Sequence, residues 1–285
     1  MFGMSRLRLA QKLPAPPACD IQGRTAGNTL LITAGMDGDE YAGIEAAHLL
    51  IEKYRSGNFN GRLVVVPIIN LAGFENKSSH NPTDGKLPKN IFPGRARGSA
   101  SEQLVHWLVA THVSAADAWL DLHGGALTES LTPFLWTYQT GVKSVDARTE
   151  KFYKASGAEI VLLQKAGMFT KARALAKRKR PCTYVMAESG ERGERKQEDI
   201  ERHIHWAEVL MRQLGMLPAT DHTQQPNELP GESLRELPKK AQLVLRNIQY
   251  GYTSERMAHD SLRGIILWHK EKSERKDDIL YGIGY

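Results

Sequence analysis

The stretch TLLITAGMDGDEYAGIEAAHLLIEKY, residues 29–54, decides the fold. Its first seven residues form a nearly continuous apolar run, as in a strand that is buried on both faces of a parallel sheet. Apolar side chains then recur at helical spacing, for example Ile44 and Ile51. A second apolar run, RLVVVPIIN at 62–70, follows. The order strand, helix, strand predicts a βαβ unit.

Further apolar runs and helical patterns extend this alternation along the chain. Ser99 and Glu102 form a capping-box pair at the start of a predicted helix, and Gly157 and Gly215 stand where helix C-termini end. We therefore expect an α/β fold with a mixed, largely parallel sheet flanked by helices. The expected strands lie at 118–123, 133–138, 159–163 and 182–188, and the expected helices at 100–113, 145–156 and 198–214.

The two ends of the chain differ from the middle. Residues 1–20 contain basic side chains but no long apolar run, and we interpret them as an N-terminal arm rather than a signal peptide. Residues 217–238 are rich in proline and polar side chains, which is typical of a linker. Short strand-like pieces in 239–285 predict a small β-rich C-terminal segment. The main domain is expected to span 21–216.

Composition narrows the class of protein. The chain has 285 residues, of which 41% are hydrophobic, so it can bury a full core. A net charge of +6 is too small to indicate a nucleic-acid partner without a binding motif. Cys19 and Cys182 alone support neither a disulfide framework nor a four-cysteine zinc site. We expect a cytoplasmic protein that has no membrane span.

Four side chains with metal or acid–base chemistry follow predicted strands. Asp37 and Glu40 come after the first strand, His123 ends LDLH, and Glu188 ends CTYVMAE. The carboxyl ends of strands are where ligands gather in α/β sheets. Two carboxylates and an imidazole there are able to share one cation and leave a position open for water. Acids at a helix start are also typical of ordinary helix caps, so chemistry alone leaves both interpretations open.

Five fragments resemble one known family in their order and spacing. They are GRTAGNTLLITAGMDGDEYAGIEAAHLL, VVVPIINLAGF, IFPGRARGSASEQL, ADAWLDLHGG and PCTYVMAESG. Together they resemble the succinylglutamate desuccinylase/aspartoacylase family of zinc hydrolases, which are related to the zinc carboxypeptidases. The resemblance covers roughly 21–216 and implies a metallohydrolase domain there.

The resemblance assigns roles by position. It implies that Asp37, Glu40 and His123 are the metal ligands and that Glu188 is the base that moves protons. The family's first ligand is a histidine, and this chain has Asp37 in its place. That exchange lowers the charge of metal plus ligands from about +1 to about 0, which weakens the Lewis acid. We therefore expect Zn²⁺, with Mn²⁺ or Fe²⁺ as alternatives because they accept oxygen ligands more readily.

A second departure concerns the cations that bind substrate. Where the family pattern has N-x-N-R before FPG, this chain reads LPKNIFPG, which puts Lys89 and Asn90 at the positions of Asn and Arg. The other family arginine is replaced near Ser79. A lysine offers a point charge rather than a planar fork. We assign substrate binding to Lys89, Asn90 and Arg95, with solvated loop residues as the alternative.

Other polar residues are interpreted as structural or surface residues rather than as parts of the site. His48 is expected to be buried or half-buried in its helix, and His203 and His205 are expected on the surface. The basic run KARALAKRKR, 171–180, is interpreted as a solvated face.

The predicted function is a metal-dependent amidohydrolase that removes an acyl group from an N-acyl amino acid or a related small molecule. We expect a small, anionic substrate and no nucleic-acid or membrane partner, and a homo-oligomer is left open. A carboxypeptidase-type peptidase is the nearest alternative. A non-catalytic binding relative with a degenerate metal site is the alternative from another class.

Overall fold

A seven-stranded sheet organises the molecule in the computed structural model, which describes residues 15–167 and 170–219. The strand order is β1-β3-β2-β4-β7-β5-β6. The predicted arm up to residue 14, the linker beyond residue 219 and the segment 239–285 lie outside the described residues. The strands are β1 (Cys19–Gln22), β2 (Thr29–Ala34), β3 (Arg62–Val66), β4 (Ala118–His123), β5 (Phe134–Gln139), β6 (Val161–Lys165) and β7 (Thr183–Glu188).

The sheet is mixed, as predicted. Strands β3, β2, β4 and β7 run parallel, and β5 joins the edge of β7 in the opposite direction with β6 parallel to it. At the other edge β1 pairs antiparallel with β3, and no strand was predicted there. The carboxyl ends of the four central parallel strands therefore lie on the same side of the sheet, and the predicted site lies at these strand ends.

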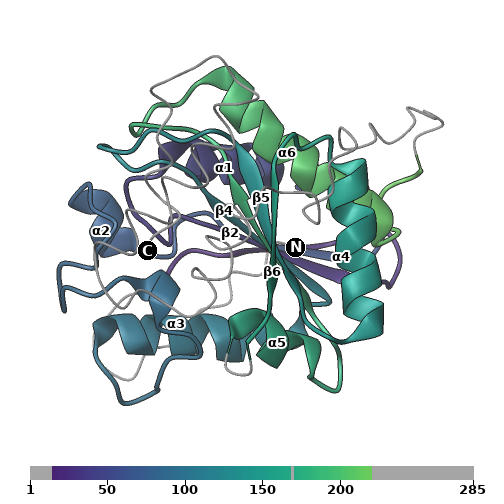
Figure 1. Ribbon diagram of the computed structural model, residues 1–285, viewed down its shortest axis with the longest axis horizontal. Helices are drawn as coiled ribbons and strands as arrows, with labels where there is room; N and C mark the ends of the chain where they lie inside the picture. Colours follow the sequence, from purple (N-terminus) through teal and green to yellow (C-terminus); the bar gives the residue numbers. More distant parts are fainter. Residues whose placement is uncertain (1–14, 168–169, 220–285) are drawn as a thin grey trace, which may run out of the picture.

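Helices cover both faces of this sheet. Figure 1 shows α1, α4 and α6 on one side and α3 and α5 on the other. The long helices are α1 (Tyr41–Tyr54), α3 (Ala100–Thr111), α4 (Lys143–Ala155) and α6 (Gln197–Gln213), the short ones are α2 (Leu71–Glu75) and α5 (Lys171–Ala176), and Pro88–Asn90 and Val113–Ala115 are 3₁₀ turns.

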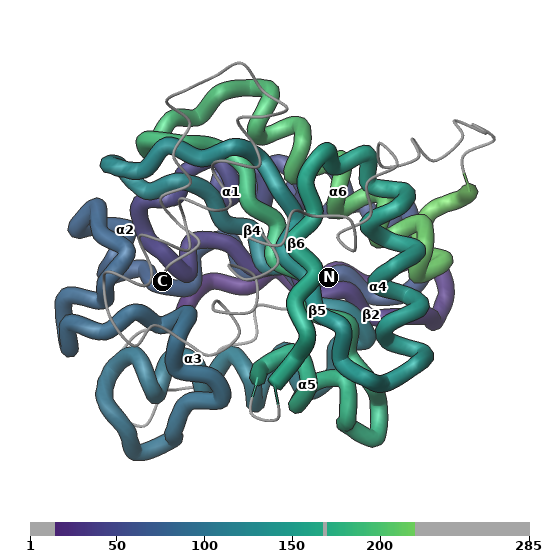
Figure 2. The backbone as a smooth tube through the Cα atoms, in the orientation of Figure 1, coloured from purple at the N-terminus to yellow at the C-terminus, as the bar shows by residue number. Residues whose placement is uncertain are grey.

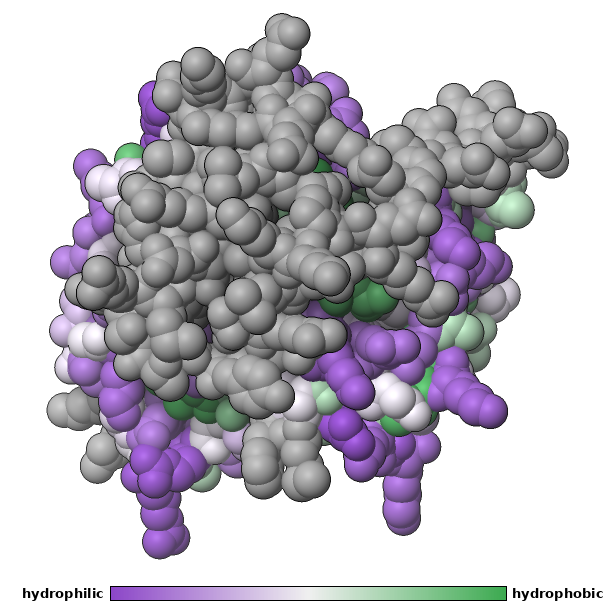
Figure 3. Space-filling model, in the orientation of Figure 1, coloured by the Kyte–Doolittle hydropathy of each residue, from purple (hydrophilic) through white to green (hydrophobic). Residues whose placement is uncertain are grey.

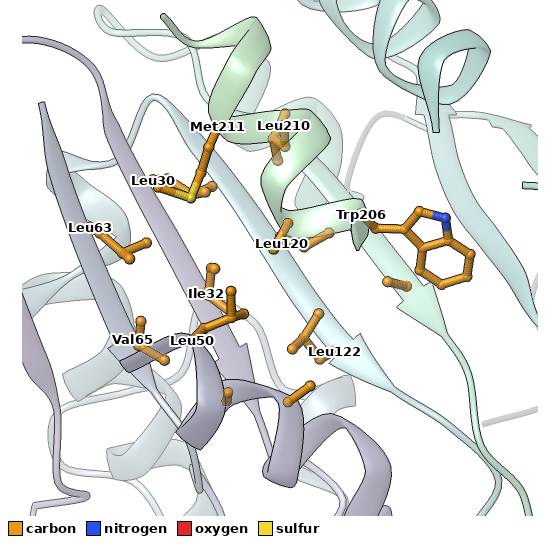
Figure 4. Close-up of a cluster of buried hydrophobic side chains, with 14 of the residues drawn as sticks. Leu30, Ile32, Leu50, Leu63, Val65, Leu120, Leu122, Trp206, Leu210 and Met211 are labelled. Atoms are coloured by element: carbon orange, nitrogen blue, oxygen red, sulfur yellow. The ribbon is translucent and has the colours of Figure 1, made fainter. Parts of the chain in front are cut away.

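Alternation along the strands sorts the core into two layers. Leu30 and Ile32 of β2 pack in the layer under α1 and α6, whereas Leu31 packs in the layer under α3 and α5. Figure 4 shows the first layer, where Leu50 of α1 and Met211 of α6 meet the strands. Both faces of β2 are thus buried, which explains its continuous apolar sequence.

Several predicted element ends are confirmed. The capping box of Ser99 and Glu102 is present at the start of α3. Gly157 and Gly215 follow α4 and α6 with φ of 67° and 71°, where a side chain would be strained. Helix α2 was not predicted, because it is a short turn of helix within the segment 71–98, whose path toward α3 is visible in Figure 2.

Part of the surface of the described residues is visible in Figure 3. On the face shown in Figure 3, hydrophilic side chains cover most of the area that belongs to described residues. Leu49 and Leu127 are the large hydrophobic side chains exposed among residues 15–167 and 170–219. None of the helices in those ranges is both long and apolar enough to span a membrane.

Candidate metal centre

The predicted ligands meet at the carboxyl edge of the parallel strands. His123 is the last residue of β4 and Glu188 the last of β7, and the two stand opposite each other in the sheet register. Asp37 and Glu40 lie in the turn between β2 and α1, next to β4. Residues separated by more than eighty positions are thus brought to one place by strand pairing.

The turn after β2 has little room for side chains. Gly35 has φ of 61°, a left-handed conformation that favours glycine. A Cβ on Gly38 would lie 2.1 Å from the backbone nitrogen of Phe74 in α2. The glycines therefore let the turn press against α2, and this fixes the backbone that carries Asp37 and Glu40.

Asp37, Glu40 and His123 form one buried cluster. One possible ligand atom from each residue lies within 4.8 Å of the others. His123 Nδ1 is 2.9 Å from Glu40 Oε2 and 3.9 Å from Asp37 Oδ2. Glu40 stands at the N-cap position of α1, yet its side chain makes no capping hydrogen bond and instead accepts one from the backbone N–H of Gly124 at 3.2 Å. The geometry excludes the helix-cap interpretation for Glu40.

This donor set fits a divalent cation. Ligand atoms around a tetrahedral zinc ion lie about 3.5 Å apart, since each bond is about 2.0–2.2 Å long. The separations of 2.9 and 3.9 Å bracket that value. Asp37 Oδ1 is buried and has no hydrogen-bond partner. Buried polar atoms are normally paired, so this oxygen is available as a metal ligand. The cluster is thus able to hold a metal ion.

Lys89 reaches the same cluster from the 3₁₀ turn Pro88–Asn90. Its Nζ contacts Asp37 Oδ2, and its side chain is only 11% exposed. Burial raises the pKa of Asp37 to about 7, with repulsion from Glu40 adding to the effect and Lys89 opposing it. A bound cation would favour the charged carboxylate and lower this pKa.

Glu188 is a buried carboxyl group that stands opposite His123 in the sheet register. It is 5% exposed, and burial raises its pKa to about 8, while His123 opposes the shift and Glu40 adds to it. A catalytic carboxyl works best when its pKa lies near the operating pH. The raised pKa of Glu188 lies in the range that such a catalytic carboxyl group would need.

The outer side of His123 faces a carboxylate that sequence reasoning missed. His123 Nε2 lies 3.5 Å from Oδ2 of Asp121, which is fully buried. Asp121 precedes His123 by two positions on β4, so the two side chains share one face of the strand. The sequence did contain a signal for Asp121, because it is a charged residue in an otherwise apolar strand and lies two positions before the predicted ligand His123.

The remaining predicted substrate-binding residues lie less close to the cluster. Asn90 is exposed. Arg95 is 74% exposed at its side chain and donates to Glu102 at 3.0 Å. Asp39 is buried and accepts a hydrogen bond from Ser79 at 2.7 Å, so it supports the loop. The structure brings Lys89, but not Arg95, into contact with the predicted ligands.

Two histidine predictions were wrong. His48 is exposed on α1. His203 is fully buried in α6, where its Nε2 lies 3.0 Å from the carbonyl oxygen of Ser189. It thus holds the backbone next to Glu188. His205 is exposed, as predicted, and Cys182 is buried, with its thiol pKa raised by burial to about 12.

The loops that follow β4 and β7 are connected to each other by hydrogen bonds. The loop after β4 and the loop after β7 exchange backbone hydrogen bonds, from Gly125 N to Gly190 O at 2.7 Å and from Arg192 N to Glu129 O at 2.8 Å. The chain segments that follow His123 and Glu188 are therefore joined to each other through their backbones.

Sequence comparison assigns the chain to a family. Residues 26–214 match the family described as succinylglutamate desuccinylase/aspartoacylase catalytic domain. The chain belongs to this family. Over 140 residues it is 31% identical to the N-alpha-acetyl-L-2,4-diaminobutyric acid deacetylase of Halomonas elongata, a match that covers 49% of this chain and 41% of that relative.

Solved structures show the same fold. The succinylglutamate desuccinylase/aspartoacylase from Rhodobacter sphaeroides has a TM-score of 0.67 at 23% identity, covering 77% of this chain and 66% of that one. The product-bound ectoine utilization protein EutE (DoeB) from Ruegeria pomeroyi has a TM-score of 0.66 at 25% identity, covering 77% and 68%. The chain thus spans about two thirds of the length of these structural relatives and less than half of the curated one.

Proposed function

We propose that this member of the succinylglutamate desuccinylase/aspartoacylase family is a metal-dependent deacylase that hydrolyses the amide bond of an N-acylated amino acid or a related small molecule. The observation that carries the proposal is the buried meeting of Asp37, Glu40 and His123 beside Glu188. Family membership and the likeness to a deacetylase support the choice of reaction.

Asp37, Glu40 and His123 would hold the ion, with Zn²⁺ first and Mn²⁺ or Fe²⁺ as alternatives. When bound, such an ion supplies a Lewis acid for the scissile carbonyl and for water. The oxygen donors of Asp37 and Glu40 outnumber the single imidazole, which suits metals that accept oxygen ligands. Metal identity therefore belongs among the first measurements.

The chain's own residues supply proton transfer and positive charge. Glu188 would accept the proton of the attacking water on its carboxylate and pass it to the leaving amine. Lys89 would direct its ammonium group toward the carbonyl oxygen or an acidic group of the substrate, because its Nζ lies at the edge of the cluster. Substrate contacts by Asn90 and Arg95 stay predictions.

The deciding experiment combines metal analysis with a substrate panel. Protein purified without added metal is assayed on N-acetyl, N-succinyl and other N-acyl amino acids, and on peptides with a free C-terminus, before and after chelation. We expect one divalent ion per chain, hydrolysis of acyl amino acids and loss of activity with chelator. Activity that persists in metal-free protein would remove the proposal.

The same panel separates the alternatives. Faster hydrolysis of peptides would favour a carboxypeptidase-type peptidase. Bound metal and bound ligand without turnover would favour a non-catalytic relative. The family match and the deacetylase relative do not favour either.

A further inference from the structure

Lys171 is a largely buried cation that the mechanism above does not use. It is the first residue of α5 and of the basic run 171–180, yet its side chain is only 14% exposed. Its Nζ lies 3.6 Å from Asp121 Oδ2, and 4.7 Å and 4.3 Å from the ring centroids of Trp119 and Tyr184. Because an ammonium group loses much hydration on burial, this contact set indicates a specific role.

The carboxylate of Asp121 is held from three directions. Thr33 of β2 donates its hydroxyl to Oδ1 at 2.5 Å, and Tyr184 of β7 donates to Oδ2 at 3.0 Å. Lys171 faces the same Oδ2 from α5. Trp119 in turn donates to the hydroxyl oxygen of Thr33 at 2.6 Å. Asp121 therefore has a fixed plane as well as a fixed position.

The carboxylate of Asp121 lies at ion-pair distance from His123. Oδ2, the oxygen shared by Tyr184 and Lys171, is the one that lies 3.5 Å from His123 Nε2. The other ring nitrogen, Nδ1, points to Glu40 and Asp37. A carboxylate behind a ligating histidine fixes its tautomer and ring orientation, and thereby which nitrogen the metal meets.

We propose that Lys171 is a positioning residue of the metal centre, which holds Asp121 Oδ2 against His123 Nε2 so that His123 presents Nδ1 to the cation shared with Asp37 and Glu40. This inference rests on the proposed function, since it takes these three residues to be metal ligands. Lys171 acts through Asp121 and touches no ligand itself.

Charge and positioning predict opposite effects on metal affinity. A positive charge near the cluster repels a divalent cation, so its removal would tighten binding if charge alone mattered. If Lys171 positions Asp121, its removal loosens His123 and weakens binding. The sign of the change therefore separates the two roles.

The test is Lys171→Met, with Zn²⁺ affinity measured by chelator competition and the ligand field read from the visible spectrum of the Co²⁺-loaded protein. We expect affinity to fall by about 10-fold, the lower end of the range for residues that support metal ligands. We also expect the Co²⁺ absorption bands to change. The matched control is Lys177→Met, which removes an exposed lysine just after the same helix and should alter neither readout.

A second variant removes a donor without changing charge. Tyr184→Phe deletes the hydroxyl that contacts the same Oδ2, and it should weaken Zn²⁺ binding and change the Co²⁺ spectrum in the same direction as Lys171→Met. This variant decides the matter if Lys171→Met does not fold.

Three results would overturn the inference. The first is unchanged or tighter Zn²⁺ binding with an unchanged Co²⁺ spectrum in folded Lys171→Met. The second is an unaltered metal site in Tyr184→Phe. The third is an unmodified protein that binds neither ion, which would remove the proposed function as well. If the unmodified protein binds metal and both variants have the same Zn²⁺ affinity and Co²⁺ spectrum as that protein, only the role of Lys171 is contradicted and the proposed function stands.

Discussion

Among single side chains, Asp37 carries the most distinctive chemistry of the site. One of its oxygens contacts Lys89 and the other is buried without a partner. Under the proposed function, Asp37 would pair with two cations, the ammonium group of Lys89 and the metal ion. Its charge is thus more important than its shape.

Replacing Asp37 by Asn tests that charge. Asp37→Asn keeps the size of the side chain but should lower metal affinity by more than the 10–100-fold typical of supporting residues, since a ligand is lost. The matched control is Asp39→Asn, two residues away, because Asp39 accepts a hydrogen bond from Ser79 and lies outside the cluster. Metal content after dialysis measures both. Equal metal content in the two variants would contradict the ligand assignment.

Replacing Glu188 by Gln tests proton transfer. Glu188→Gln should lower kcat by about 10²–10⁴-fold, because a glutamine cannot accept the proton of water. Metal content should be unchanged, since Glu188 is outside the ligand set. Glu191→Gln, in the loop that follows, serves as control because Glu191 pairs with Lys196. Full activity of Glu188→Gln would contradict the role of this residue.

The meeting of Asp37, Glu40 and His123 was predictable from the sequence, because they lie at the ends of apolar strands and match the motifs of the family that the chain resembles. Asp121 and Lys171, the residues that lie behind His123, were not predicted. Nothing in the basic run 171–180 distinguishes Lys171 from its solvated neighbours, and only the packing of α5 against β7 buries it next to Asp121. Sequence shows which groups end the strands, whereas burial of a distant lysine depends on tertiary contacts.

The turn between β2 and α1 is the element on which ligand geometry depends. Gly38→Ala should destabilise the protein by at least about 1–3 kcal/mol, because the added Cβ would overlap the backbone of α2. It should also lower metal content. Gly167→Ala is the control, since the nearest atom to its added Cβ is Thr170 Cγ2 at 3.7 Å. Urea unfolding measures both variants, and similar midpoints for the two would contradict the tight packing.

Elements with strong periodicity were predicted well, and short elements were not. The strand at 118–123 was found with the predicted bounds. In contrast, β1 has four residues, and its strand conformation depends on pairing with β3 at the sheet edge. Helix α2 has five residues and is fixed by contacts around Asn70 and the turn after β2. Such elements carry too few residues for a periodic signal.

For the whole molecule, the buried site should make stability depend on pH when metal is removed. Asp37 and Glu188 have pKa values raised by burial to about 7 and 8, and Glu40 and Asp121 together outweigh burial and raise the pKa of His123 above its ordinary value. Each therefore binds more protons in the folded state than in the unfolded state near neutrality. Stability must then fall as pH rises through this range.

The expected result is a melting temperature in chelator that falls by roughly 3–8 °C between pH 6.5 and 8.5. The pKa of His203, lowered by burial to about 4, has the opposite effect on stability, and this effect falls mainly below pH 6.5, the ordinary pKa of histidine. Added Zn²⁺ should reduce the slope, because a bound cation keeps the carboxylates charged at both pH values. A melting temperature that rises with pH in chelator would contradict this account.

The hydrogen bonds between the loops after β4 and β7 have a consequence for engineering. Because Gly125 and Glu129 are tied to Gly190 and Arg192, a loop grafted alone from a relative would lose its partner's contacts. A transplant should therefore move both segments together. Libraries should likewise vary both segments at once, because backbone hydrogen bonds join them.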